Sequence, residues 1–142
     1  REYAGCGKKM AFLAGGETVV HLRGRGKGGR NQEIALSAAR GIAGLSNVAV
    51  FSFGSDGTDG PTDAAGGYAD GSTAARLLEA GLSIPDVLER NDAYHALENR
   101  MAFLLQANRD QCQRSVRASY WLMTTLKSTL FAVFCKVLFL LK

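Results

Sequence analysis

A basic, glycine-rich loop is the first part of this sequence that can do chemistry. Four cations stand among four glycines in RGRGKGGRNQE, residues 23–33: Arg23, Arg25, Lys27 and Arg30. Glycines let backbone amides approach a ligand, and the start of a helix adds positive potential. Arg30 ends the loop and offers a bidentate fork to a carboxylate or phosphate. The segment therefore predicts an anion site, and a solvated turn is the alternative.

The same loop matches the dinucleotide fingerprint GxGxxG at Gly24, Gly26 and Gly29. That fingerprint also needs an acid about 20 residues further on for the ribose. Asp56 stands 27 residues past Gly29, so an NAD site is kept only as an alternative. The other loop residues that we expect to contact substrate or phosphate are Lys27, Gly28, Arg30 and Asn31.

A second glycine-rich loop, GSDGTDGPTDAAGGYADG, carries three acids: Asp56, Asp59 and Asp63. It is not an EF-hand, because the twelfth position from Asp56 is Gly67 and not Glu. Loops that follow strands in α/β folds often hold ligands, and their acids can bind Mg²⁺ or accept a hydroxyl proton. Asp56 and Asp59 are our candidates for these roles. Turn chemistry is the alternative for each single Asp.

Two further candidates lie in the segment LERNDAYH: Asn91 and His95. His95 is the third residue of a helix that Asp92 is expected to cap. A histidine at such a place is more often a capping or packing residue than a catalyst.

Strand and helix signals alternate around these loops. The expected elements are a strand over 18–22, a helix over about 31–42, a buried strand over 48–53, a helix from 70 or 72 through 78, a short helix opened by Ser83 and Pro85, and a helix starting at Ala93. Asn31 is the expected cap of the first helix. The alternation predicts an α/β fold with strand–loop–helix units around a small mixed sheet.

Charge and glycine content divide the chain near residue 98. Residues 1–98 hold 10 basic and 12 acidic residues, a balance of −2, whereas residues 99–142 hold 7 and 1, a balance of +6. All 17 glycines lie at or before Gly81. We therefore expect an organised unit over 1–98 and a divergent apolar, basic tail over 99–142. The balance of the first unit argues against a broad nucleic-acid surface.

The tail contains one long apolar stretch, Trp121–Leu141, which Lys127 and Lys136 interrupt. Each lysine would cost about 2.5–3.5 kcal/mol at a bilayer centre, and nine residues place the two on opposite faces of a helix. We rank an unselected apolar tail first, an interfacial anchor or partner helix second, and a transmembrane span third. The three cysteines match no metal or redox motif.

Three segments together resemble the carboxy-terminal (MOFRL) domain of the glycerate 2-kinase family: GGETVVHLRGRGKGGRNQE, SFGSDGTDGPTDAAGGYADG and LERNDAYH. The resemblance covers about Gly15 to His95. It implies a two-domain α/β enzyme with a cleft between its domains. Such an enzyme transfers the γ-phosphate of ATP to D-glycerate with Mg²⁺, in the cytoplasm or in mitochondria.

The resemblance also implies roles for the candidate residues. Arg30 would clamp the glycerate carboxylate, and the amides of residues 24–29 would approach the phosphates of ATP. Asp56 and Asp59 would hold Mg²⁺ or receive the hydroxyl proton.

Two departures from the family lead us to expect a fragment that is inactive alone. The chain starts at Arg1 without the larger amino-terminal domain, and no Gly-Pro-Thr-Gly-Thr-Asn segment follows His95. Splicing or a frame change would explain the altered end. A non-catalytic binding module, with a tail that associates with a membrane or a partner, is the alternative.

Overall fold

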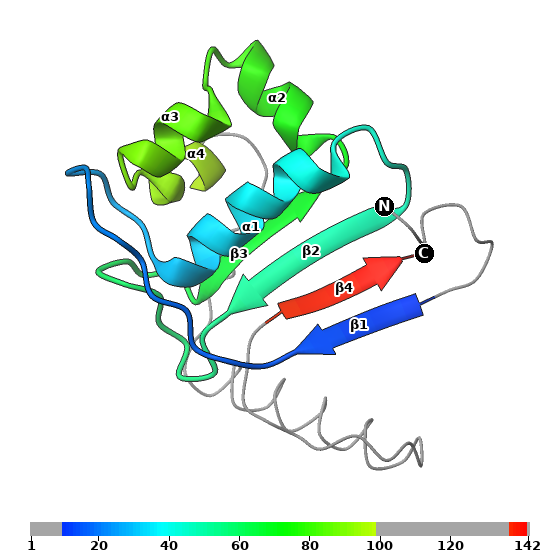
Figure 1. Ribbon diagram of the computed structural model, residues 1–142, viewed down its shortest axis with the longest axis horizontal. Helices are drawn as coiled ribbons and strands as arrows, with labels where there is room; N and C mark the ends of the chain where they lie inside the picture. Colours follow the sequence, from blue (N-terminus) through cyan, green and yellow to red (C-terminus); the bar gives the residue numbers. More distant parts are fainter. Residues whose placement is uncertain (1–9, 99–136, 142) are drawn as a thin grey trace.

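The computed structural model describes residues 10–98 and 137–141, which form a four-stranded sheet and four helices (Figure 1). The elements in chain order are β1 (Met10–Ala14), α1 (Arg30–Ile42), β2 (Val48–Phe53), β3 (Gly66–Asp70), α2 (Thr73–Glu79), α3 (Ile84–Glu89), α4 (Ala93–Glu98) and β4 (Val137–Leu141).

The strand order in the sheet is β1-β4-β2-β3, and all three neighbouring pairs are antiparallel. The expected α/β class is confirmed, but the sheet is antiparallel and not mixed. β1 and β2 run in the same direction on either side of α1, as in a βαβ unit. They do not pair with each other because β4 lies between them and pairs with both.

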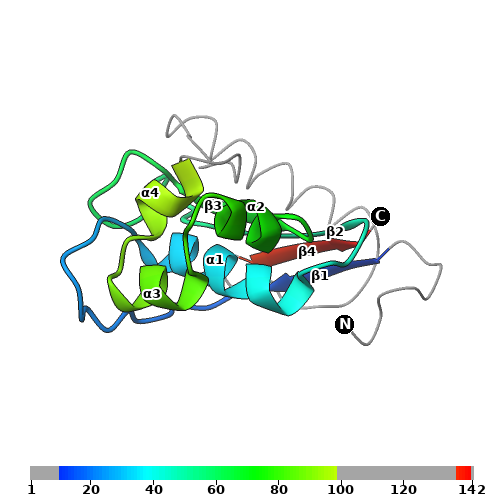
Figure 2. The ribbon, with the colours of Figure 1, turned by 90° about the horizontal axis from the view of Figure 1, so that it is seen from above.

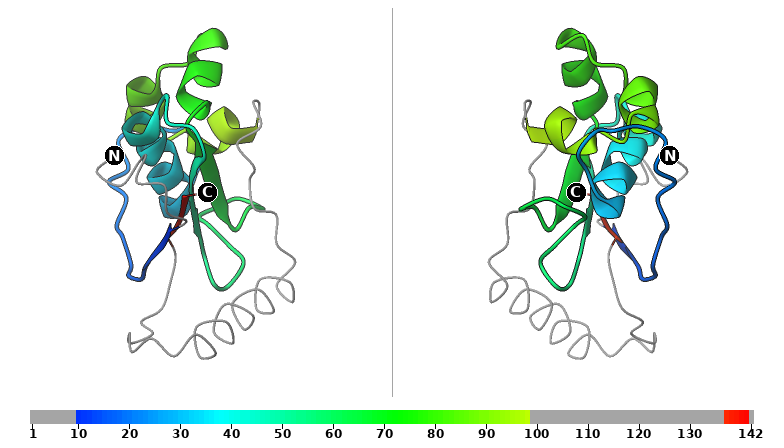
Figure 3. Two further views of the ribbon diagram at one scale, coloured as in Figure 1. Left: turned by 90° about the vertical axis from the view of Figure 1, so that its right-hand side faces the viewer. Right: turned by 90° about the vertical axis from the view of Figure 1, so that its left-hand side faces the viewer.

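Helix α1 lies along one face of the sheet, against β2 and β3, with α3 on the same side (Figures 2 and 3). The core between the sheet and the helices contains Leu36 and Ala39 of α1, Ala69 of β3, Leu77 of α2, Val87 of α3 and Leu97 of α4. Alternate residues of β2 are buried toward this layer. These buried contacts fix the position of α1 against the sheet. The first turn of α1 carries the candidate site, so the contacts also fix the position of that site.

Several local predictions are confirmed. β2 spans the residues expected of it, and α1 occupies the expected helix but starts one residue earlier. Gly44 and Gly81 adopt left-handed backbone angles just after α1 and α2, where glycine pays no steric cost. Pro85 lies in the first turn of α3, where its missing N–H leaves no bond unmade.

The strand expected over residues 18–22 is wrong. These residues form an extended connection from β1 to α1, in which the side chains of Val19 and Leu22 are 83% and 81% exposed. An alternating sequence becomes a strand only where a neighbouring strand accepts its hydrogen bonds. β4 pairs instead with residues 10–14, which the sequence did not mark as a strand.

β3 was hidden inside the second glycine-rich loop. A Cβ atom on Gly66 would overlap with the backbone of Ser52 and Phe53 in the adjacent strand. The glycine that looked like a turn signal is therefore needed for close strand approach.

Most of the predicted tail lies outside the described residues. The five that are described, Val137–Leu141, form β4 inside the sheet. The expectation of an anchor or membrane span over Trp121–Leu141 falls otherwise on residues 121–136, which are not described. In residues 10–98 and 137–141, no helix has the length and hydropathy needed to cross a bilayer.

Candidate active site

The two glycine-rich loops meet at the start of α1, at the end of the sheet where β2 ends and β3 begins (Figure 1). Gly29 packs against Asp59, and Gly60 packs against Gly28. The acidic loop therefore faces the basic loop at this point.

The basic loop has a defined shape because residues 90–94 hold its backbone. The amide of Gly26 donates to the carbonyl of Arg90 over 2.9 Å, and the amide of Lys27 donates to Oδ1 of Asp92 over 3.0 Å. The carbonyl of Lys27 accepts from the amide of Tyr94 over 2.9 Å. A Cβ atom on Gly24 or Gly26 would overlap with this segment. Close packing against residues 90–92 therefore explains both glycines without a bound ligand.

Asn91 completes the attachment of the basic loop. Its Oδ1 accepts from the amides of Arg23 (2.7 Å) and Gly24 (2.9 Å), and its Nδ2 donates to Oε1 of Glu33 over 2.8 Å and to the carbonyl of His21 over 3.3 Å. Asn91 is buried and has a left-handed φ of 55°. Asn91 therefore holds the loop in place, and the amides of Gly24, Gly26 and Lys27 all donate hydrogen bonds within the chain.

A cation, an aromatic ring and a carboxylate form a chain of contacts across the two loops. The Nζ of Lys27 lies 4.0 Å from the ring centre of Tyr94, and the Tyr94 hydroxyl donates to Oδ1 of Asp63 over 2.7 Å. This hydrogen bond raises the pKa of Tyr94 to about 12 and lowers the pKa of Asp63. Tyr94 was not among the predicted site residues, although the sequence places it beside His95.

Asp59 caps α1 from the second loop. Its Oδ1 accepts from the amide (3.0 Å) and side-chain Nδ2 (2.8 Å) of Asn31, and its Oδ2 accepts from the amide of Gln32 over 2.9 Å. Asp59 is 2% exposed. Three N–H donors and the positive end of the helix compensate this buried charge. Asn31, the expected cap, is instead the second residue of the helix and one of the donors.

Buried polar side chains extend this cap into the domain. The Oγ of Ser52 donates to Oδ1 of Asn31 over 2.7 Å, and Nε2 of Gln32 donates to Oγ1 of Thr62 over 2.9 Å. Thr62 in turn donates to the carbonyl of Asp59 over 2.7 Å. The sequence did not point to Gln32, Ser52 and Thr62, because each joins the site through a hydrogen-bond partner at least 20 residues away in the chain.

Arg30 is the first residue of α1, and its guanidinium reaches out of the polar cluster. Its Nη1 contacts Oε1 of Glu17, from the connection that leads out of β1. The Arg30 side chain is 31% exposed and that of Glu17 is 74% exposed. The Arg30 side chain is thus partly buried and already holds a carboxylate, whereas the side chain of Glu17 stands largely in solvent.

His95 and Asp92 form a second pair beside the basic loop, with Nδ1 of His95 2.6 Å from Oδ1 of Asp92. Burial raises the pKa of Asp92, but the hydrogen bonds from Lys27 and His95 outweigh it and leave the pKa below its ordinary value. Asp92 therefore stays charged, and its bond to the amide of Lys27 links the start of α4 to the basic loop.

The predicted magnesium ligands do not gather into a metal site. Asp59 is occupied by α1, and Asp56 lies on the surface with its Oδ1 accepting from the amide of Thr58 over 3.2 Å. Within the described part of the chain, no three His, Cys, Asp or Glu side chains are placed to share a metal ion. Mg²⁺ normally takes oxygens from one or two carboxylates plus substrate phosphates. The acids described here therefore form no magnesium site of their own, and any Mg²⁺ would depend on substrate phosphates for most of its ligands.

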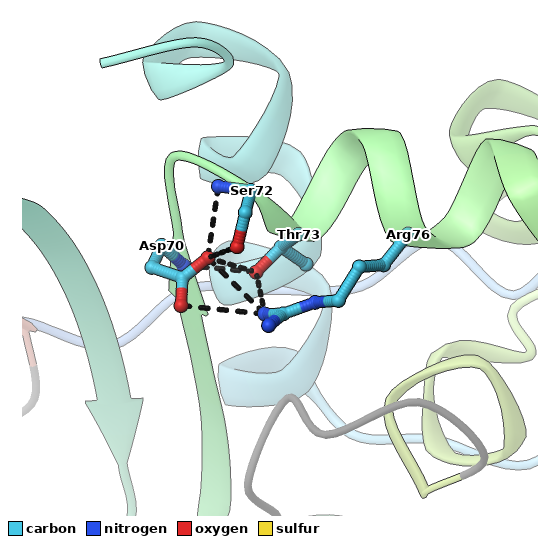
Figure 4. Close-up of polar contacts among 4 residues, drawn as sticks. All are labelled: Asp70, Ser72, Thr73 and Arg76. Carbon is cyan, nitrogen blue, oxygen red and sulfur yellow. Dashed lines mark hydrogen bonds and ion pairs between the residues drawn. The ribbon is translucent and has the colours of Figure 1, made fainter. Parts of the chain in front are cut away.

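A separate polar cluster lies at the other end of β3 and is not part of this site (Figure 4). Asp70 accepts from Ser72 (2.7 Å), Thr73 (3.1 Å) and Nη2 of Arg76 (3.1 Å). Burial raises the pKa of Asp70, and these hydrogen bonds lower it further than burial raises it. The cluster fixes the turn from β3 into α2.

Comparison with known families identifies the domain. A profile of the MOFRL family matches residues 10–110, which is most of the chain. The chain belongs to the MOFRL family.

Named relatives are glycerate kinases. The chain is 54% identical over 98 residues to D-glycerate 2-kinase of Thermotoga maritima, covering 69% of the chain and 24% of that protein. It is 54% identical over 90 residues to glycerate 2-kinase of Pyrococcus horikoshii (63% and 20%). It is 43% identical over 89 residues to human glycerate kinase (60% and 17%).

A solved structure extends the similarity to the fold. A crystal structure of glycerate kinase from Thermotoga maritima superposes with a TM-score of 0.73 and 41% identity, covering 93% of this chain and 27% of that one. The chain thus spans between about a sixth and about a quarter of the length of these relatives.

Proposed function

We propose that this chain supplies the substrate-carboxylate site of a D-glycerate 2-kinase, with Arg30 as the binding residue. The observation that carries the proposal is the contact between Arg30 and Glu17. A half-buried guanidinium at a helix start already holds a carboxylate, and its partner is an exposed side chain on a connecting segment. The carboxylate of glycerate would take the place of Glu17, and Arg30 would bind it through two parallel N–H donors.

ATP would bind beside this site. The amides of Gly24, Gly26 and Lys27 already donate hydrogen bonds within the chain, so other groups would contact the phosphates. These are the Lys27 ammonium, which Tyr94 holds in place, and the amides of Gly28 and Gly29 next to α1. Asp56 stays our candidate for the hydroxyl proton of glycerate, and Asn91 and His95 support the loop.

The reaction would be a direct phosphoryl transfer. A glycerate hydroxyl oxygen forms the new bond to the γ-phosphorus, the bond from that phosphorus to the β,γ-bridging oxygen breaks, and ADP leaves while the hydroxyl proton passes to a base. Positioning and neutralisation of charge account for most of the catalysis of such steps. Mg²⁺ would neutralise phosphate charge when bound, with phosphate oxygens supplying most of its ligands.

Binding of D-glycerate to the 142-residue chain tests the proposal. We expect heat of binding in isothermal titration with the native chain, and affinity lower by roughly tenfold or more in Arg30→Ala, the loss typical of a charge-assisted pair. Arg40→Ala, at the exposed end of the same helix, is the matched control. Equal affinity in native chain and Arg30→Ala would refute the role of Arg30.

We further propose that the 142 residues bind glycerate without turning it over. The activity in the relatives' names belongs to proteins of which this chain spans 24% or less. A coupled assay for ADP release, with Mg-ATP and D-glycerate at saturation, checks this. Steady glycerate-dependent ADP release that Arg30→Ala abolishes would contradict it.

A further inference from the structure

We propose that Asp59 is a positioning residue: it holds the first turn of α1, sets the direction in which Arg30 leaves the helix, and does not hold a metal ion. Its effect on glycerate binding rests on the function proposed above. Its effect on α1 and its lack of metal binding stand on the geometry alone.

Donors from within the chain occupy three of the roughly four acceptor positions of the Asp59 carboxylate. Two donors of Asn31 converge on Oδ1, and the amide of Gln32 reaches Oδ2 at 2.9 Å. Asp59 is buried, so a metal ion would have to compete with these donors and lose most of its own water ligands. It would also sit at the positive end of a 13-residue helix, where a cation is repelled. The bound donors, the burial and the positive field of the helix start therefore all disfavour a divalent ion at this carboxylate.

The same contacts determine where Arg30 points. Arg30 is joined directly to Asn31, and the two amides that Asp59 binds belong to the second and third residues of the helix. The N-cap residue is Gly29, which brings no side chain of its own to cap the helix. Asp59 is thus the side chain that caps α1. Without Asp59, the amides of Asn31 and Gln32 lose their acceptor, and the first turn of α1 is less firmly held. The backbone from which the Arg30 side chain extends is then no longer fixed.

The test is NMR on the full 142-residue chain, comparing native protein with Asp59→Asn and with Glu79→Gln. Glu79 is an exposed acid at the end of α2, so its variant removes one charge without touching the site. The first measurement is hydrogen exchange at the amides of Asn31 and Gln32. Both carboxylate oxygens accept from N–H groups, so Asp59→Asn replaces one acceptor with an NH₂ donor and removes the charge. We expect exchange faster by about tenfold or more in Asp59→Asn and unchanged exchange in Glu79→Gln. Unchanged exchange in Asp59→Asn would overturn the proposal.

The second measurement needs no variant to fold. Mn²⁺ is added to the native chain as a paramagnetic stand-in for Mg²⁺, and line broadening is mapped along the backbone. We expect the signals of Asn31, Gln32 and Asp59 to broaden no more than those of α2. Selective broadening centred on these three residues would identify Asp59 as a metal ligand and overturn the proposal.

The third measurement links Asp59 to Arg30. If the native chain binds D-glycerate, Asp59→Asn should weaken binding by about tenfold, and adding it to Arg30→Ala should weaken binding little further. Fully additive losses would show that Asp59 acts independently of Arg30 and would overturn the positioning role. If the native chain binds no glycerate, the function proposed above fails, while exchange and Mn²⁺ broadening still decide the role of Asp59.

Discussion

The hydroxyl of Tyr94 donates to Asp63 over 2.7 Å while the face of the same ring carries the ammonium of Lys27 at 4.0 Å. One side chain of α4 thus touches both glycine-rich loops. The amide of Tyr94 also donates to the carbonyl of Lys27, so the cation is fixed at its backbone and at its end.

Tyr94→Phe should release Asp63 without moving Lys27. The ring and its cation–π contact remain, but the carboxylate loses the hydroxyl donor that lowers its pKa. We expect the pKa of Asp63 to rise toward its ordinary value, as followed by the side-chain carboxyl carbon in an NMR titration. An unchanged pKa would show that the hydroxyl does not donate to Asp63 in solution.

The same bond predicts how stability depends on pH. Because folding lowers the pKa of Asp63, its stabilisation is present above the pKa of the unfolded chain, about 4, and is lost as pH falls through the folded value. Urea unfolding of native chain and Tyr94→Phe should therefore differ near neutral pH and converge in acid. A difference that grows in acid would contradict the assignment.

Glu17→Gln should strengthen glycerate binding. The Glu17 carboxylate occupies the guanidinium of Arg30 and must leave before the carboxylate of glycerate can bind, whereas a neutral amide competes weakly. An exposed ion pair is worth about 0.2–1 kcal/mol, so affinity should rise by a factor of roughly 1.4 to 5 in a calorimetric titration. Weaker binding in Glu17→Gln would mean that Glu17 supports Arg30 and does not compete for it.

Asn91 tests the attachment of the basic loop. Asn91→Gly keeps a backbone that tolerates the left-handed φ of 55° but removes the side chain that bonds Arg23, Gly24 and Glu33. We expect a loss of about 2–4 kcal/mol in the free energy of unfolding. Asn91→Ala adds backbone strain and should be less stable still. Equal stability of Asn91→Gly and native chain in urea titrations would show that the loop does not depend on these bonds.

Two glycine substitutions should act in opposite directions. A Cβ on Gly24 would overlap with backbone atoms of Arg90, whereas a Cβ on Gly41 in α1 would meet open space. Gly24→Ala should destabilise by about 1–3 kcal/mol, as overpacking does. Gly41→Ala should stabilise by about 0.5–1 kcal/mol through helix propensity. Thermal unfolding of both variants checks this, and a neutral Gly24→Ala would mean that the loop does not pack on residues 90–92.

Elements encoded by local pattern were predictable. Ile34, Ala35, Ala38, Ala39 and Ile42 recur at helical spacing, and β2 is a short apolar run, so both were expected close to their observed bounds. The strands at 10–14, 66–70 and 137–141 were not, because strand formation depends on partners distant in sequence. The strand expected at 18–22 failed for the same reason.

The site was predictable in its residue types and less so in its contacts. Arg30 and Asp59 were both singled out, but the sequence could not show that Asp59 caps a helix that begins 29 residues before it. Nor could it show that the loop glycines pack against residues 90–92. Hydrogen bonds between remote segments decide which polar groups stay available to a ligand.

The Arg30 guanidinium offers the most direct test of the central claim, through the ¹⁵N signals of its side chain in the native chain as D-glycerate is added. If Arg30 binds the glycerate carboxylate, its Nε–H signal should shift as glycerate is added and stop shifting when the site is saturated. In Glu17→Gln the same shift should be reached at a lower glycerate concentration. Saturable glycerate binding that leaves the Arg30 signals unmoved would contradict the claim.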